Sequence, residues 1–154
     1  MPSVADNLKA LNLTLPTPAA PVAAYVPYVI SGKTVYISGQ LPLENGQVKI
    51  TGRLGESVEI AQGQEAAKLC ALNILAHLEK ACGGDWTKVE RCVKLGGFIS
   101  STDKFYDQPQ VMNGASELME KVFGEAGKHA RFAVGVGSLP KNAAVEVDAI
   151  FSLK

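Results

Sequence analysis

The sequence ARFAVGVGSLPKNAAVEVDAIF at residues 130–151 contains the clearest structural pattern in the chain. Apolar residues occupy every second position of its first part, at Phe132, Val134 and Val136. This period of two is typical of a strand that buries one face. The same alternation returns from Val145 onward. We therefore expect two strands joined by a turn.

Charged residues lie on the other face of each expected strand. Arg131 shares its face with Ala133 and Gly135, so its guanidinium has open space in front of it and can receive a small planar anion. Glu146 and Asp148 share one face of the second strand, about 7 Å apart. If the two strands pair, Arg131 and Glu146 come within reach of one site. An ordinary cross-strand charge cluster, worth about 0.2–1 kcal/mol per pair, explains the same residues equally well.

The composition limits the classes of function. The chain has 154 residues, which predicts a single domain spanning residues 1–154. Lys plus Arg and Asp plus Glu number 15 each, so the formal charge is zero. Nucleic-acid binding normally requires a Lys/Arg-rich surface, and nucleic acid is therefore not an expected partner. A neutral chain also has weak electrostatic repulsion between copies, which leaves it free to associate.

The cysteines and histidines do not form a metal-binding pattern. The three cysteines, Cys70, Cys82 and Cys92, include no Cys-x-x-Cys pair, and the two histidines, His77 and His129, belong to no recognisable acid/base pair. Neither a zinc site nor a disulfide framework is expected. Reduced, buried thiols indicate a cytoplasmic protein. With no secretory signal and no apolar run of about 18 residues, a membrane partner is not expected either.

The N-terminal part predicts a helix, an extended arm and a hairpin. Residues 3–13 follow a helical pattern, with Ser3 placed as the N-cap. The proline-rich residues 15–22 should form an extended arm. Residues 25–40 are typical of two strands around a tight turn at Gly32.

The second of these strands ends in Ser38-Gly39-Gln40. A glycine at a strand end, beside polar side chains, can bring the backbone close to a ligand. A plain strand end is the simpler interpretation of the same residues.

The central part predicts a loop and a long helix. Residues 44–56 indicate a loop or a short edge hairpin. Ser57 is the expected N-cap of a helix that runs to Cys82 and ends at Gly83. His77 lies on the apolar stripe of this helix, where a partly buried structural histidine is favoured over a ligand or a base.

A strand at 91–100 and a helix at 108–124 complete the expected elements. Asn113 falls in the first turns of the helix, where a ligand-facing amide is one interpretation and an exposed amide the commoner one. The order of elements predicts an α+β fold, with one mixed sheet and both long helices on one face. Because Val and Phe alternate on the final strands, we expect another subunit to cover the remaining face.

These features together resemble the Rid family of reactive-intermediate deaminases, the RidA or YjgF-like proteins, which also carry the older names L-PSP endoribonuclease and translation inhibitor. The resemblance extends from Pro21 to Phe151. It depends on ISGQLP at 37–42 together with AR at 130–131, LPK at 139–141 and VEVDAI at 145–150, in that order.

The resemblance implies a chorismate-mutase-like fold and a homotrimer with a cleft between each pair of subunits. It implies that Arg131 grips the carboxylate of a 2-imino or 2-enamino acid such as 2-aminoacrylate, which suits the bidentate recognition that guanidinium groups provide. Glu146 would position or activate a water that adds to the imine carbon, so that ammonia leaves and a 2-keto acid forms. An imine is already an activated electrophile, so no metal or organic cofactor is expected.

The resemblance also implies which other residues contact the substrate. They are Tyr25, with Tyr28 as the alternative, and Ser38, Gly39 and Asn113.

Three departures from the family pattern indicate a divergent subgroup. Ala-Ala-Tyr at 23–25 replaces the usual Gly-Pro-Tyr, and Ala133 stands where a cysteine is common. A helix at about 3–13 precedes the family core.

Two other functions use the same residues differently. A non-catalytic protein would bind a small carboxylic acid in the same cleft as a metabolite sensor. An endoribonuclease is disfavoured by the balanced charge and by the absence of a recognisable histidine pair.

Overall fold

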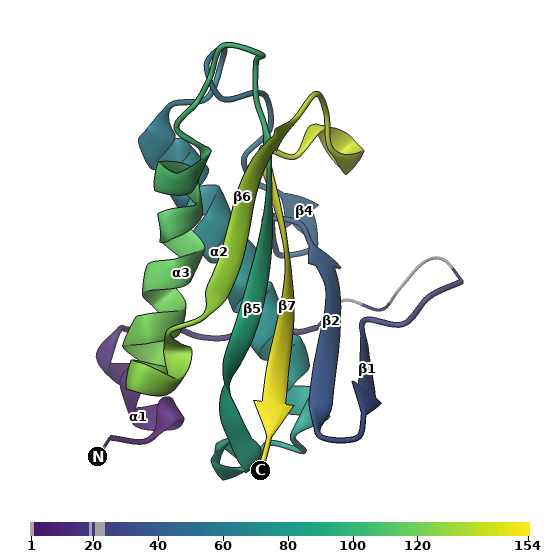
Figure 1. Ribbon diagram of the computed structural model, residues 1–154, viewed down its shortest axis with the longest axis vertical. Coiled ribbons are helices and arrows are strands. Elements are labelled where there is room, and N and C mark those ends of the chain that lie inside the picture. Colours follow the sequence, from purple (N-terminus) through teal and green to yellow (C-terminus); the bar gives the residue numbers. More distant parts are fainter. Residues whose placement is uncertain (1, 19, 21–23) are drawn as a thin grey trace.

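The computed structural model describes residues 2–18, 20 and 24–154 (Figure 1). The helices are α1 (Val4–Ala10), α2 (Ile60–Ala81) and α3 (Gln108–Phe123). The strands are β1 (Tyr28–Ser31), β2 (Thr34–Gln40), β3 (Leu43–Glu44), β4 (Gln47–Val48), β5 (Val89–Ser100), β6 (Ala130–Val136) and β7 (Val145–Leu153).

Five of these strands form one mixed sheet. Their order is β1-β2-β7-β5-β6, in which β5 and β6 are parallel and every other neighbouring pair is antiparallel. The short strands β3 and β4 pair separately. Helix α2 packs on β7 and β2, and α3 packs on β5 and β6, so both long helices cover the same face (Figure 1). The predicted α+β architecture is confirmed.

The core lies between this sheet and the two helices. On β7 the buried side chains are Val145, Val147, Ala149 and Phe151, which alternate with partly or fully exposed residues. The alternation predicted from the sequence is therefore correct. The prediction that another subunit covers these residues is wrong, because the helices of the same chain bury them.

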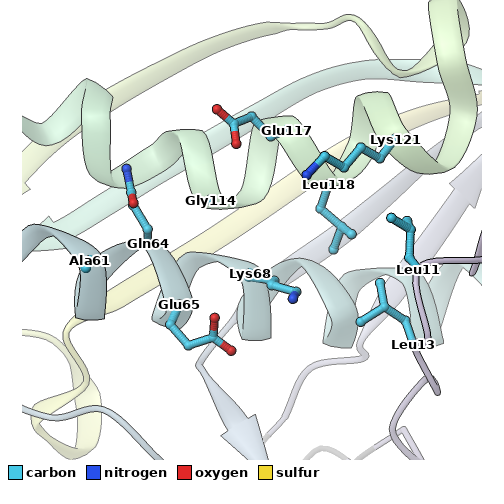
Figure 2. Close-up of a pocket in the computed structure, with 10 residues that line it drawn as sticks. All are labelled: Leu11, Leu13, Ala61, Gln64, Glu65, Lys68, Gly114, Glu117, Leu118 and Lys121. Atoms are coloured by element: carbon cyan, nitrogen blue, oxygen red, sulfur yellow. The ribbon is translucent and has the colours of Figure 1, made fainter.

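The two long helices approach each other closely at Gly114 of α3. A Cβ atom at this position would lie 2.0 Å from the carbonyl oxygen of Gln64 on α2, so a larger residue does not fit. Figure 2 shows Gly114 facing the α2 helix beside Gln64. This contact fixes α3 relative to the sheet.

Strands β6 and β7 do not pair with each other, although the sequence pattern suggested that they could. Strand β5 lies between them and pairs with both. Residues 95–100 of β5 are buried or half-buried on both faces, and the backbone N–H and C=O groups of such a buried strand need partners along both edges, which a central position provides. Alternation along a strand shows which residues share a face, but it does not show which strand lies alongside.

Two predicted helix boundaries are wrong. Helix α2 begins at Ile60 with Glu59 as N-cap, because the hydroxyl of Ser57 accepts the backbone N–H of Arg53 within a tight turn. Helix α1 ends at Ala10, earlier than predicted, although Ser3 is its N-cap as expected.

The proline-rich arm is described only in part. Residues 15–18 and 20 have no regular secondary structure, and the remaining positions of the predicted arm lie outside the described residues.

The face of the sheet away from the helices is partly apolar. Val29, Tyr36 and Val134 on this face are 51%, 49% and 43% exposed. Oligomerisation through this face stays a prediction. Across residues 2–18, 20 and 24–154, no helix has the length and hydrophobicity needed to cross a bilayer.

Candidate functional site

Arg131 lies near the start of the edge strand β6 and is directed toward helix α3. Its Nη1 donates to Asn113 Oδ1 at 2.9 Å and to Ser116 Oγ at 3.0 Å, and its Nη2 donates to the carbonyl oxygen of Pro109 at 3.2 Å. Asn113 and Ser116 are three residues apart, so both lie on the same side of α3. Helix α3 therefore holds the guanidinium through three hydrogen bonds.

These contacts leave part of the guanidinium free. Of its five N–H groups, both on Nη1 and one on Nη2 are used. Among the described residues, the Nε–H and the second Nη2–H have no partner. The Nε and Nη2 nitrogens lie on one edge of the guanidinium, and the N–H groups of that edge match the two oxygens of a carboxylate. A surface pocket of about 310 Å³ lies beside Arg131, lined by Asn113, Ser116 and His129 among others.

Glu146 lies on strand β7 with Gly39 directly beside it. A Cβ atom on Gly39 would lie 2.1 Å from Glu146 Oε2, so the glycine makes room for the carboxylate. Burial, followed by the charge of Asp148, raises the pKa of Glu146 above its usual value. Glu146 is therefore a better proton acceptor near neutral pH than an exposed glutamate.

A bulge in strand β2 places Ser38 and Gly39 beside Glu146. The pairing with β7 shifts between Ile37 and Gln40, where β2 carries one extra residue. Bulges of this kind redirect side chains and occur often beside active sites. The sequence had indicated a special backbone position at Gly39.

Ser38 links this region to the segment before β1. Its hydroxyl donates to the carbonyl oxygen of Val26 at 2.8 Å, and its backbone N–H donates to Pro27 at 2.9 Å. Tyr25, just before this segment, is 54% exposed, whereas Tyr28 packs against the core. Tyr25 is the more exposed of the two tyrosines, and its contact with a ligand stays a prediction.

Arg131 and Glu146 lie on opposite faces of the sheet. Arg131 is paired with Leu95, which is buried under the helices, whereas Glu146 is paired with Phe98, which belongs to the other face. The suggestion that strand pairing within one chain brings them to one site is therefore wrong. The predicted residues form two groups: Arg131 with Asn113, and Glu146 with the Ser38–Gly39 bulge.

Sequence reasoning missed Ser116 and His129. His129 Nε2 lies 2.9 Å from Ser116 Oγ, and His129 Nδ1 lies 2.6 Å from the carbonyl oxygen of Gly127. His129 thus contacts Ser116, which in turn contacts Arg131. Two spacings in the sequence could have indicated these residues. His129 lies two residues before Arg131, the spacing of residues that share one face of an extended segment, and Ser116 follows Asn113 by about one helical turn.

The remaining titratable candidates are structural. Burial lowers the pKa of His77 and raises the pKa of the Cys92 thiol to about 12. Cys70 and Cys82 are also buried, free thiols with raised pKa values, and such thiols are poor nucleophiles. Within the described ranges, no group of three or more His, Cys, Asp and Glu side chains is arranged to hold a metal ion.

A second pocket lies away from these residues, between α2, α3 and the segment after α1 (Figure 2). Its volume is about 240 Å³, and its lining combines Leu11, Leu13 and Leu118 with two lysines and two glutamates. None of the predicted site residues lines it.

A mixed sheet covered on one face by two helices defines an α+β protein. The chain matches the family described as YjgF/chorismate_mutase-like, putative endoribonuclease, over residues 5–152, and it belongs to that family. The resemblance to the RidA or YjgF-like proteins is thereby confirmed.

Individual relatives span almost the whole chain. Protein TCP17 of Trypanosoma cruzi is 48% identical over 151 residues, which cover 97% of this chain and 94% of the relative. The 2-iminobutanoate/2-iminopropanoate deaminase of Dermatophagoides farinae is 30% identical over 139 residues, covering 90% and 92%. The crystal structure of Atu1372 from Agrobacterium tumefaciens, a protein of unknown function, has a TM-score of 0.92 and 49% identity, covering 98% and 92%.

Proposed function

We propose that this protein hydrolyses reactive 2-imino and 2-enamino acids, such as 2-aminoacrylate, to 2-keto acids and ammonia. The observation that carries the proposal is the guanidinium of Arg131, which α3 holds in place while two N–H groups on one edge stay free. The relative from Dermatophagoides farinae, whose name states this activity, supports it.

Arg131 would bind the substrate carboxylate through Nε–H and Nη2–H. Such a charge-assisted, two-point contact fixes the carboxylate plane. The imine carbon is the atom next to the carboxylate, so this contact also fixes the electrophile.

Glu146 would take a proton from the attacking water. The water oxygen bonds to the imine carbon, and Glu146 passes the proton on to the imine nitrogen. The hydroxyl group of this adduct then gives up its proton to the nitrogen as the C–N bond breaks, so that ammonia leaves and a carbonyl group remains. The raised pKa of Glu146 suits a group that accepts a proton and then returns it. These steps involve the two protein groups and water, so the proposal requires no metal or cofactor.

The two groups of residues would meet between copies of the chain. Arg131 at the edge strand of one copy would face the Ser38–Gly39 bulge and Glu146 of the next copy, in a head-to-tail contact that closes into a homotrimer. The apolar face that carries Tyr36 and Val134 supports such an association. We also propose a cytoplasmic location, since the three thiols are free.

The test is a deaminase assay in which 2-aminoacrylate is generated from serine and pyruvate release is followed. Arg131→Ala should abolish the acceleration, and Arg131→Lys, which keeps the charge but loses the planar fork, should lose most of it. Arg53→Lys is the matched control, because Arg53 donates to the backbone of Ser101 at another site. Full activity in Arg131→Ala would reject the proposal.

A non-catalytic carboxylate binder is the second candidate. It is favoured by the position of Glu146 on the face opposite Arg131. One chain can then bind a carboxylate through Arg131 with no base beside it. Calorimetry with pyruvate decides between the two: binding without turnover of any imine supports the binder.

A further inference from the structure

We propose that Ser116 and His129 are positioning residues that orient the Arg131 guanidinium, so that a carboxylate binds only to its Nε/Nη2 edge. The inference deepens the proposed function and rests on it. It assigns a role in substrate recognition to residues that do not contact the substrate.

The tautomer of the neutral His129 ring follows from its contacts. Nδ1 lies 2.6 Å from the carbonyl oxygen of Gly127, and a carbonyl oxygen only accepts hydrogen bonds. In that ring Nδ1 therefore carries the hydrogen, and Nε2 is an acceptor. Because Nε2 lies 2.9 Å from Ser116 Oγ, the serine hydroxyl donates to it.

The direction of that bond decides what Ser116 offers to Arg131. With its hydrogen turned to His129, the oxygen presents a lone pair to Nη1, which lies 3.0 Å away. Without an acceptor at His129, the hydroxyl can rotate and donate to a backbone carbonyl one turn earlier in α3, as helical serines do. Arg131 would then lose a defined partner.

The same contact sets which edge of the guanidinium is open. Asn113 and Ser116 together use both N–H groups of Nη1, so the Nη1/Nη2 edge has no complete pair to offer. Only the Nε/Nη2 edge keeps two free N–H groups. If Ser116 no longer accepts, one N–H of Nη1 is released while Asn113 and Pro109 still accept, so the guanidinium loses one of the three contacts that fix its orientation.

The experiment compares removal with conservative replacement at each position. Ser116→Ala and His129→Phe remove the hydrogen bonds, whereas Ser116→Thr keeps the hydroxyl and His129→Gln places an amide oxygen near the position of Nε2. Ser138→Ala, in an exposed turn, is the matched control. Alanine is a better helix former than serine, so Ser116→Ala is not expected to unfold α3.

Pyruvate affinity by calorimetry and the kinetics of 2-aminoacrylate hydrolysis are the two readouts. Ser116→Ala and His129→Phe should raise Kd and KM about tenfold, the size expected for one lost hydrogen bond to a charged group, while kcat changes less than about twofold. Ser116→Thr and His129→Gln should stay within about threefold of wild type. The nitrogen-15 NMR shifts of His129 in the wild-type protein should show the Nδ1–H tautomer.

Each result supports or overturns the inference. If Ser116→Ala and His129→Phe bind pyruvate as wild type does while Arg131→Ala does not, the positioning role is wrong and the proposed function stands. Equal losses in the conservative variants, or an Nε2–H tautomer, also overturn it. If the wild-type protein neither binds pyruvate nor speeds hydrolysis, the proposed function fails and this inference fails with it.

Discussion

The Arg131 and Glu146 regions are built in opposite ways. Around Arg131, the guanidinium donates hydrogen bonds to an amide oxygen, a hydroxyl oxygen and a backbone carbonyl oxygen of helix α3, which hold it in place. Around Glu146, a glycine in a bulge leaves space, and the carboxylate lies there half-buried. The first region is fixed within one chain, whereas the second is an open surface that a neighbouring chain can complete. Substrate binding and proton transfer can therefore be tested separately.

The largest expected effect is on catalysis at Glu146. Glu146→Gln keeps the shape of the side chain but cannot accept a proton, so kcat should fall about 100-fold or more. Pyruvate affinity, measured by calorimetry, should change little because Arg131 is intact. Unchanged kcat in this variant would show that Glu146 is not the base.

A mixture of two inactive variants tests whether each site takes residues from two copies of the chain. If each site takes Arg131 from one copy and Glu146 from the next, co-expressed Arg131→Ala and Glu146→Gln chains should regain about one quarter of wild-type activity by random assembly. Each variant expressed alone is the control. No recovery in an oligomer shown to be mixed would contradict a site that is shared between two copies.

The next effect concerns the contact that positions α3. On an open helix surface, Gly→Ala stabilises by about 1 kcal/mol. Gly114→Ala should instead destabilise the fold by about 1–3 kcal/mol, because the new methyl group meets the Gln64 backbone. Urea unfolding measures the change. Gly137→Ala, where a Cβ atom has nothing within 4 Å, is the control and should be nearly neutral.

A smaller effect is expected from the other close glycine. Gly39→Ala also introduces a collision, but the atom it meets is the end of the flexible Glu146 side chain, which can move away. Stability should therefore change by less than about 1 kcal/mol, whereas kcat falls about tenfold as the carboxylate leaves its position. A large loss of stability with normal kcat would show instead that Gly39 is needed for folding and not for the position of Glu146.

The smallest effect is a shift in pH dependence. The charge of Asp148 is the second cause, after burial, of the raised pKa of Glu146. Asp148→Asn removes that charge, so the pKa of Glu146 should fall toward its usual value. A base must be deprotonated to act, and the acidic limb of the kcat/KM profile should therefore move to lower pH. A shift to higher pH, or none, would exclude this coupling.

The same raised pKa values predict a dependence of stability on pH. A carboxyl group whose pKa is higher in the folded state than in the unfolded state binds protons more readily when folded. Its contribution to the free energy of unfolding is favourable at low pH and declines as pH rises from its pKa in the unfolded state through its higher pKa in the folded state. Asp148→Asn should flatten this part of the stability curve.

Much of the fold followed from local patterns. Alternation identified the buried face of β7, the turn at Gly32 joined β1 to β2, and Ser3 capped α1 as expected. These features depend on neighbours in sequence, which is why they were predictable. The N-cap of α2 was not, because the Ser57 hydroxyl bonds within a turn that starts at Arg53.

The family, the α+β class and the chemical identity of the candidate groups could be predicted from the sequence, because motifs and periodicity are properties of the order of residues. The spatial relations required the folded chain: β5 separates β6 from β7, Arg131 and Glu146 face opposite sides, and His129 contacts Arg131 through Ser116. These relations join residues from different elements. They depend on which surfaces pack together, and packing is set by the burial of the whole chain.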